Sequence, residues 1–279
     1  MIEIVEPGPL ATVQDLGRTG WASLGVPRSG AFDRSAARVA NRLVGNPADS
    51  AVIEITYGGL AVRLPAAATL ALTGAVCPGA DFGVAFSVAA GRTVRLGAPG
   101  AGGLRSYLAV RGGVAVDAVL GSRSTDLLSG LGPARLHAGD RLPVGRAPAE
   151  APSGATAALT RPPRPLRISL APRADWFGLD AAGVLTSTAW TVRTDSDRIG
   201  VRLDGPALAR TRDGELTSEP TLPGALQVPA DGRPILLGPD APVTGGYPVI
   251  AVLADADLDL AGQLRPGDTV TFRSGSGSG

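Results

Sequence analysis

The chain carries the same short motif near the end of each half of its sequence. Leu136-His-Ala-Gly-Asp140 and Leu264-Arg-Pro-Gly-Asp268 each lead into alternating apolar residues, which is the pattern of a turn that enters a strand. A second pair of similar segments, residues 54–62 and 219–228, lies upstream in the same order. Two matches in the same order indicate that one structural unit occurs twice in this chain.

The linker and the composition define the expected units further. Residues 145–165 are rich in Ala, Pro, Ser and Thr, as in a linker between domains. We therefore expect one domain at residues 1–150, a second at 160–273 and a flexible Ser-Gly tail at 274–279. The chain has 39 glycines and 24 prolines, which favour short strands and tight turns over long helices. The expected fold class is mainly β with few helices, built from two barrel-like domains.

Local patterns predict three elements within these domains. Residues 33–44 are expected to form a helix, because Asp33 is a suitable N-cap and apolar residues follow at helical spacing until Gly45. Residues 166–170 and 249–253 are short apolar runs, and we expect both to form strands.

Missing residue types exclude several kinds of chemistry. The chain contains no lysine, which excludes a P-loop lysine, a Schiff-base lysine and a biotinylated lysine on this polypeptide. With one histidine, His137, and one cysteine, Cys77, it has neither a His-rich zinc site nor an internal disulfide, and we expect no metal site. His137 precedes a Gly-Asp turn and is expected to be a turn residue. Cys77 has no basic neighbour and is expected to be an unreactive thiol.

Charge and hydropathy narrow the location and the partners. The net charge is +1, without long blocks of one sign, which argues against nucleic acid or a membrane surface as the main partner. No apolar stretch approaches the roughly 20 residues needed to cross a bilayer. The first residues lack the basic and apolar regions of a signal peptide. We therefore expect a cytoplasmic protein.

Polar residues gather among glycines in several loops of this alanine-rich chain. Glycine permits positive φ and close backbone approach, so such loops present amide donors to a carboxylate or phosphate. Arginine then holds the anion through two parallel hydrogen bonds. Asp, Asn, Ser and Gly also form ordinary turns between strands. From the residues alone, both explanations stay open.

A series of loop motifs runs along nearly the whole chain. They are Asp15-Leu-Gly-Arg18, Gly25-Val-Pro-Arg-Ser-Gly-Ala-Phe-Asp33, Ala40-Asn-Arg-Leu-Val-Gly-Asn46, Tyr107-Leu-Ala-Val-Arg111, Leu120-Gly-Ser-Arg-Ser-Thr-Asp126, Asp197-Arg-Ile-Gly-Val-Arg202, Ser218-Glu219, Gln227-Val-Pro-Ala-Asp-Gly232, Thr244-Gly-Gly-Tyr-Pro248 and Gln263-Leu-Arg-Pro-Gly-Asp268. In this order, the motifs resemble the family of the 5-oxoprolinase C subunit, also called allophanate hydrolase subunit 2. This family includes the carboxyltransferase domain of urea carboxylase, and the resemblance implies a pair of cyclophilin-like β-barrel domains.

The resemblance implies a subunit of an ATP-dependent 5-oxoprolinase, which hydrolyses 5-oxoproline to L-glutamate. It implies a smaller homologous partner, similar to the B subunit of 5-oxoprolinase or to allophanate hydrolase subunit 1, and a third partner of the LamB/YcsF type, the A subunit. ATP, with Mg²⁺, is expected at the level of the complex, because phosphorylation of the lactam oxygen turns a poor electrophile into one that water attacks. The chain is not expected to be active alone.

Two other functions stay open. One is a carboxyltransferase of the allophanate or urea type that uses biotin carried on another chain. The other is a non-catalytic regulatory partner of a kinase inhibitor, as sporulation-linked relatives suggest. A neighbouring LamB/YcsF-type gene favours the 5-oxoprolinase, a biotin-carboxylase gene favours the carboxyltransferase, and the absence of both favours the regulator.

Chemistry assigns roles to the loop residues. Arginines are expected to clamp an anion, and a carboxylate to act as a base or anchor. These groups are expected to line one concave pocket in the second half, with the loops around Arg18 and Asp33 forming a wall of this pocket or of its pseudo-symmetric twin. The expected catalytic residues are Arg198, Glu219 and Tyr247, and the expected substrate-binding residues are Arg18, Asp33, Arg202, Gln227, Asp240, Thr244, Gly245 and Gly246.

One departure from the family pattern concerns the residues before Thr244. The family carries polar residues there, often Gln and Thr, whereas this chain has Ala241, Pro242 and Val243. If those polar side chains touch substrate in relatives, this chain lacks some of the contacts, which leaves its substrate open and allows an altered or a lost activity.

Overall fold

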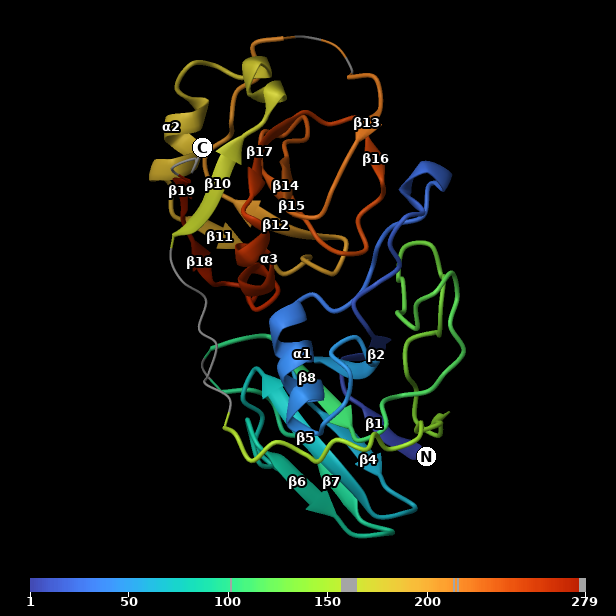
Figure 1. Ribbon diagram of the computed structural model, residues 1–279. Helices are drawn as coiled ribbons and strands as arrows, with labels where there is room; N and C mark the ends of the chain where they lie inside the picture. Colours follow the sequence, from blue (N-terminus) through green and yellow to red (C-terminus); the bar gives the residue numbers. More distant parts are fainter. Residues whose placement is uncertain (101, 157–164, 213, 215, 276–279) are drawn as a thin grey trace. The chain divides into compact units, whose positions relative to one another are not determined.

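The computed structural model describes residues 1–100, 102–156, 165–212, 214 and 216–275 (Figure 1). The chain divides into two compact units. Unit 1 comprises Met1–Thr19 and Ser29–Arg161, and unit 2 comprises Gly20–Arg28 and Pro162–Gly279. Segment 20–28 therefore groups with the second unit, although we expected it within the first domain. Residues 157–164 of the expected linker and 276–279 of the expected tail lie outside the described residues.

Unit 1 contains two β-sheets and an α-helix in its described part. One sheet has the order β7-β4-β1-β9 and the other the order β2-β3-β8-β5-β6. The elements are β1 (Ile2–Pro7), β2 (Leu10–Gln14), α1 (Arg34–Leu43), β3 (Val52–Thr56), β4 (Leu60–Arg63), β5 (Ala68–Gly74), β6 (Ala85–Val88), β7 (Thr93–Arg95), β8 (Arg105–Val110) and β9 (Arg141–Leu142).

The five-stranded sheet of unit 1 is buried on both faces. Leu70 and Leu72 of β5 face a core that Ile4 and other apolar residues of the four-stranded sheet complete. Ala71 and Tyr107 point the other way and contact α1. Because successive side chains of a strand point to opposite faces, a run of consecutive apolar residues such as β5 fits a strand covered on both sides.

Helix α1 forms where the sequence predicts a helix. The Asp33 Oδ1 atom accepts a hydrogen bond from the Ala36 amide at 2.9 Å, which makes Asp33 the N-cap. The Asp33 amide donates to the Tyr107 hydroxyl at 2.7 Å and ties the start of the helix to β8. The predicted helix is confirmed.

Unit 2 is dominated by one eight-stranded sheet of order β18-β11-β12-β15-β14-β17-β10-β19. Its edge strands β18 and β19 are separated only by Thr271 in the chain, so the sheet curls into a nearly closed barrel. A two-stranded ribbon, β13-β16, is separate from it. The elements are η1 (Ala22–Leu24), β10 (Leu166–Leu170), η2 (Pro172–Trp176), α2 (Ala181–Ser187), β11 (Trp190–Val192), β12 (Gly200–Asp204), β13 (Glu219–Pro220), β14 (Ala225–Gln227), β15 (Ile235–Leu237), β16 (Thr244–Gly245), β17 (Val249–Leu253), α3 (Asp255–Ala261), β18 (Thr269–Val270) and β19 (Phe272–Ser274).

The fold class is confirmed as mainly β with few helices. The predicted strands at 166–170 and 249–253 are β10 and β17, with the expected bounds. In the described part of the chain, no helix is both long and apolar enough to span a bilayer. Cys77 is buried, and this burial raises the pKa of its thiol, as an unreactive thiol requires.

The repeated Gly-Asp motif forms the same turn in both units. The Asp140 carboxylate accepts a hydrogen bond from the His137 amide at 2.7 Å, and the Asp268 carboxylate accepts one from the Arg265 amide at 2.9 Å. Each turn leads into a short strand, β9 or β18. The first sequence match therefore marks equivalent local structure, and His137 is an exposed turn residue as expected.

The second sequence match was wrong as a guide to equivalent strands. It pairs β4 with β14, but β4 lies between β7 and β1 in the four-stranded sheet, whereas β14 lies between β15 and β17 in the eight-stranded sheet. Glu54 lies in β3 of the large sheet, and Glu219 lies in the two-stranded ribbon. The strand orders of the two units differ accordingly, because short apolar runs between turns resemble one another whatever they pair with.

Candidate functional site

The two-stranded ribbon of unit 2 brings together two motifs that are about 25 residues apart in the chain. Glu219 of β13 pairs with Gly245 of β16, and Pro220 pairs with Thr244. The Thr221 amide donates to the Val243 carbonyl at 2.8 Å and continues this pairing. The Ser-Glu motif therefore lies beside the Thr-Gly-Gly-Tyr-Pro motif, as the site hypothesis requires.

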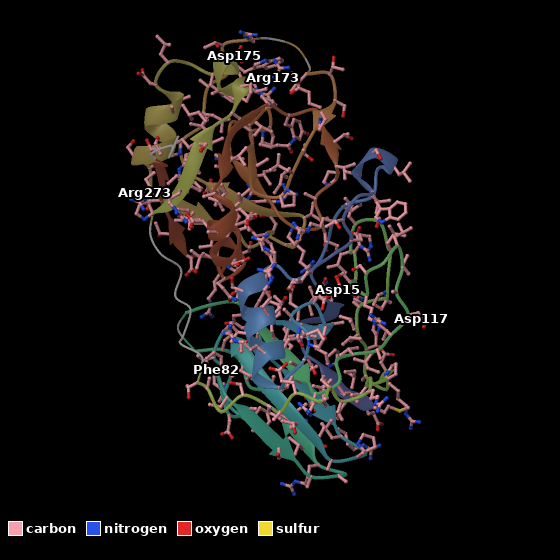
Figure 2. The ribbon with its side chains drawn as sticks, in the orientation of Figure 1. Asp15, Phe82, Asp117, Arg173, Asp175 and Arg273 are labelled. Carbon is pink, nitrogen blue, oxygen red and sulfur yellow. The ribbon has the colours of Figure 1, made fainter. Side chains whose placement is uncertain are left out.

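Arg173 completes this site and was missed in the sequence. It lies in η2, directly after β10 (Figure 2). Its Nε donates to the Glu219 Oε2 at 3.0 Å, and its Nη2 donates to the Glu219 Oε1, so the pair is bidentate. Both side chains are about one-third exposed, at 38% and 33%. The hydrogen bond from Arg173 lowers the pKa of the Glu219 carboxyl and raises the pKa of the guanidinium. Glu219 is thus held as a carboxylate.

Gln227 lies under the ribbon, at the end of β14. Its side chain is buried, and its Nε2 faces the Tyr247 carbonyl at 3.4 Å. A Cβ atom on Gly245 would lie 2.6 Å from the Gln227 Nε2, so glycine at this position permits the approach. Tyr247 is 49% exposed. The structure therefore groups Glu219, Gln227, Gly245 and Tyr247 around the ribbon.

Strand register places Arg202 on the same sheet face as Gln227. Ile235 pairs with Gln227 on one side and with Arg202 on the other. Directly paired residues of antiparallel strands point to the same face, and two strand spacings separate their backbones by about 10 Å. Arg202 is partly exposed, with its Nε 3.8 Å from the Asp195 Oδ2. A carboxylate of the same unit therefore already lies within salt-bridge distance of Arg202.

Arg198 and Asp240 do not line an open site, contrary to our expectation. The Arg198 Nε and Nη2 donate to the two Asp240 carboxylate oxygens, each at 2.8 Å. The two side chains are 1% and 0% exposed. The edge of the guanidinium that was expected to clamp substrate is occupied by Asp240. The pair joins the start of β12 to the loop that leads into the Thr-Gly-Gly-Tyr-Pro motif.

Arg18 and Asp33 lie in unit 1 and are also buried. The Asp33 carboxylate caps α1, so its assignment as a substrate ligand is replaced by a role in the helix N-terminus. Arg18 is 2% exposed and donates to the carbonyls of Val119 and Ser124. The two side chains were expected to help form the wall of a pocket, but Arg18 donates to backbone carbonyls and Asp33 accepts a hydrogen bond from the backbone amide of Ala36.

Replacing Asp33 with alanine is expected to lower the free energy of unfolding by about 1–2 kcal/mol, because the cap of α1 is lost. Asn, which keeps an oxygen acceptor, should retain most of the stability. Urea denaturation of both variants measures the difference. An Asp33→Ala protein as stable as the parent would show that the carboxylate does not cap the helix.

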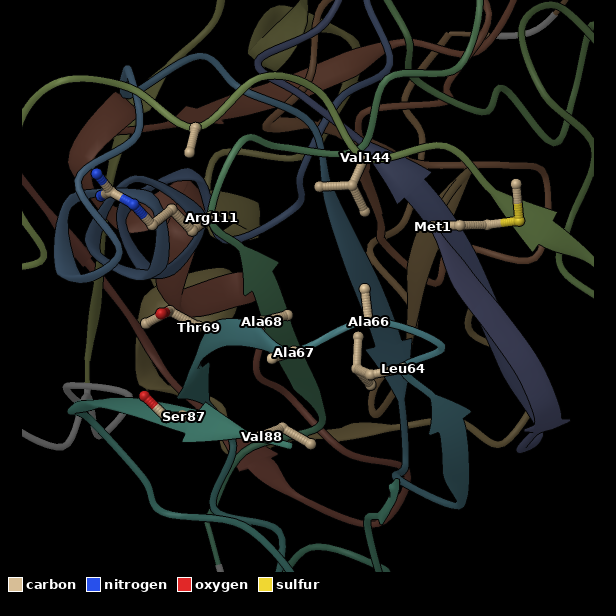
Figure 3. Close-up of a pocket in the computed structure, with 11 residues that line it drawn as sticks. Met1, Leu64, Ala66, Ala67, Ala68, Thr69, Ser87, Val88, Arg111 and Val144 are labelled. Carbon is tan, nitrogen blue, oxygen red and sulfur yellow. The ribbon is translucent and has the colours of Figure 1, made fainter. Parts of the chain in front are cut away.

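Two cavities in the described residues are lined by residues other than those of the β13-β16 ribbon. A cavity of about 420 Å³ in unit 1 is lined mainly by alanine and other apolar side chains, with Arg111 at its edge (Figure 3). Arg111 donates to the Val44 and Pro148 carbonyls at 2.8 and 2.6 Å, so its guanidinium holds backbone. A cavity of about 230 Å³ in unit 2 includes Asp231 and Gly232 in its lining, at the end of the motif that begins with Gln227.

Comparison with known proteins identifies relatives that match this chain over nearly its whole length. A family model described as "Carboxyltransferase domain, subdomain A and B" matches residues 24–274. The C subunit of the Escherichia coli 5-oxoprolinase is 38% identical over 98% of this chain and 90% of its own length. The corresponding protein of Haemophilus influenzae is 34% identical over 98% of this chain and 91% of its own length.

Solved structures of related proteins also match this chain over nearly its whole length. The crystal structure of the Kluyveromyces lactis urea carboxylase matches with a TM-score of 0.89 and 31% identity, over 97% of this chain and 27% of that one. This chain spans 55% of another crystallised relative, which is 37% identical with a TM-score of 0.87. The family model and the near full-length relatives both show that the chain belongs to the carboxyltransferase domain family that comprises subdomains A and B.

Proposed function

We propose that this chain is one of the subunits of an ATP-dependent 5-oxoprolinase that hydrolyses 5-oxoproline to L-glutamate. The observation that carries the proposal is the 38% identity with the C subunit of the Escherichia coli 5-oxoprolinase, which extends over 90% of that protein. The proposed partners are the smaller homologous subunit, of the B type, together with a LamB/YcsF-type protein. We also propose that the assembled enzyme is cytoplasmic.

The ribbon of unit 2 supplies chemistry suited to this reaction. Glu219, held as a carboxylate by Arg173, accepts a proton from water or from the lactam N–H. Gln227 and Tyr247 orient the substrate through hydrogen bonds. Arg202, on the same sheet face, binds the substrate carboxylate. Such a site works by positioning reactants and by stabilising charge.

In this proposal, ATP binds to the assembled enzyme. The chain has no lysine, and two arginines of the second half, Arg173 and Arg198, already hold carboxylates. Because these two guanidiniums already pair with carboxylates, the proposal assigns the organic substrate, and not the triphosphate, to this part of the chain.

Co-expression tests the proposal. With both proposed partners present, we expect a stable complex that buries more than about 1,000 Å² and forms glutamate from 5-oxoproline only when ATP is present. Purification followed by a glutamate assay measures both. The chain alone should be inactive. Full activity of the isolated chain, or an assembled complex without ATP-dependent turnover, would contradict the proposal.

A biotin-dependent carboxyltransferase is the second candidate. It is favoured by the match to the Kluyveromyces lactis urea carboxylase, with a TM-score of 0.89. Because this chain lacks lysine, the biotin would be carried on another polypeptide. Transfer of a carboxyl group from carboxybiotin to urea by the co-expressed complex would support this candidate over the first.

A further inference from the structure

The cavity of about 420 Å³ in unit 1 has a polar end and an apolar end (Figure 3). The polar end consists of Arg111, Thr69 and Ser87. No acidic or aromatic residue of the described chain lines this cavity, and its volume is that of a site for a small molecule. The apolar side chains that line the rest are those of Leu64, Ala66, Ala67, Ala68, Val88 and Val144.

Strand register places the three polar residues in one row. Thr69 of β5 pairs directly with Ser87 of β6. On the other side of β5, Val110 of β8 pairs with Leu70, and the next residue, Arg111, donates its amide to the Thr69 carbonyl at 2.9 Å. Residues directly opposite one another on antiparallel strands point to the same face, with backbones about 4.8 Å apart. The guanidinium and the two hydroxyls are therefore close enough to contact one ligand.

The Arg111 guanidinium has no carboxylate partner among the described residues. Two of its five N–H groups are used, because Nη1 donates to the Val44 carbonyl at 2.8 Å and Nη2 to the Pro148 carbonyl at 2.6 Å. These bonds orient the guanidinium without neutralising its charge. Glu150, on the same segment as Pro148, forms no ion pair within the described ranges. A partly buried cation of this kind attracts an anion more strongly than a cation in bulk water does.

The two hydroxyls of the row are also available to a ligand. Neither the Thr69 nor the Ser87 hydroxyl has a hydrogen-bond partner in the part of the chain that the structure describes. Thr69 is partly buried and Ser87 is exposed. A hydroxyl donates one hydrogen bond, so together they offer two donors beside the cation.

Close backbone contacts hold the wall of the cavity in place. Val144 forms a β-bridge with Val114, and the Gly145 amide donates to the Gly113 carbonyl at 3.1 Å. A Cβ atom on Gly145 would lie 2.5 Å from the Gly112 carbonyl oxygen, so glycine permits this approach. The wall is therefore ordered before a ligand binds, which reduces the entropy lost on binding.

We propose that this cavity binds a small monocarboxylic acid with an aliphatic chain. The carboxylate accepts hydrogen bonds from the Arg111 guanidinium and from the hydroxyls of Thr69 and Ser87, and the chain lies against the apolar side chains. One guanidinium compensates one negative charge, which favours a carboxylate over a doubly charged phosphate. 5-Oxoproline has no such chain, so this ligand differs from the substrate that the proposed function assigns to the ribbon of unit 2.

Calorimetric titration of the full chain with straight-chain carboxylates tests the ligand class. From butyrate through hexanoate to octanoate, we expect the affinity to rise about fourfold for each added methylene until the cavity is full. Octanamide, which has the same chain without the charge, should bind about tenfold more weakly than octanoate. Excess 5-oxoproline should not displace octanoate. Absence of octanoate binding, equal affinity for octanoate and octanamide, no dependence on chain length, or displacement by 5-oxoproline would overturn the proposal.

Ala67→Phe is the decisive variant, because it fills the cavity from an exposed position between β4 and β5. It should abolish octanoate binding while the melting temperature stays near that of the parent. Ala90→Phe is the matched control, since Ala90 is an exposed alanine of a turn that does not line the cavity. It should bind octanoate like the parent.

Polar variants test how the carboxylate is held. Thr69→Val and Ser87→Ala each remove a hydroxyl and should weaken octanoate binding about fivefold without lowering the melting temperature. Arg111→Met should remove the preference for octanoate over octanamide. Glu219→Gln should leave octanoate binding unchanged, which separates this site from the proposed catalytic one. Parent affinity in both Ala67→Phe and Thr69→Val would refute the site even if Arg111→Met fails to fold.

Discussion

Arg198→Ala is expected to lower the free energy of unfolding by about 3–5 kcal/mol, because it leaves the Asp240 carboxylate buried without its partner. Both side chains are almost fully inaccessible, and both hydrogen bonds measure 2.8 Å. The pair joins β12 to the loop before β16, so its loss should also loosen the ribbon and lower activity. Urea denaturation at neutral pH measures the stability change.

Further variants distinguish the stability contributed by the ion pair from that contributed by each residue alone. Asp240→Ala should destabilise to a similar extent, because it strands the guanidinium instead. The double variant Arg198→Met/Asp240→Leu should recover much of the stability, since apolar residues often replace a buried ion pair without loss. Arg198→Lys should recover little, because an ammonium cannot form both parallel hydrogen bonds. A loss below about 1 kcal/mol in Arg198→Ala, the value typical of an exposed pair, would show that the two residues are not buried together.

Local chemistry made parts of the fold predictable from the sequence. Helix α1 depends on a cap, Asp33, and on apolar spacing, which are both visible within about ten residues. Strands β10 and β17 are apolar runs between turns, so their bounds were correct. Strand order depends instead on pairings between distant segments, and similar segments such as 54–62 and 219–228 pair differently. Strand order therefore cannot be predicted from the local sequence of each strand.

The candidate site likewise contains residues that the local sequence predicts and residues that it does not. The motifs around Glu219 and Gly245 were expected together, and the ribbon places them side by side. Arg198 was misassigned because an arginine between aspartate and glycine resembles a loop residue, while its partner lies 42 residues away. Arg173 was missed for a similar reason: it stands in an ordinary Pro-Arg turn, and its pairing with Glu219 spans 46 residues. Burial and pairing follow from the tertiary fold.

Glu219→Gln is expected to reduce kcat of the assembled enzyme by about 10²–10⁴-fold, because glutamine cannot accept a proton. Glutamine keeps the size of the side chain and one oxygen acceptor for Arg173, so the complex should assemble normally. The measurement is ATP-dependent glutamate formation from 5-oxoproline by the co-expressed complex. Arg233→Met is the control, since Arg233 is a half-exposed arginine of the same unit that also pairs with a carboxylate, Asp204, at 2.9 Å. It should keep the parent activity.

The pH profile of Arg173→Met tests how the pair works. Arg173 lowers the pKa of the Glu219 carboxyl chiefly through the side-chain hydrogen bond, so in the parent enzyme the carboxylate persists to lower pH than an ordinary glutamate. Without Arg173 the pKa returns toward its ordinary value, and the acidic limb of kcat/KM should move to higher pH. Arg173→Lys should shift the limb less, because the cation remains. A purely structural role would lower activity equally at every pH. Parent turnover in Glu219→Gln, or an unmoved acidic limb in Arg173→Met, would remove this pair from the catalytic site.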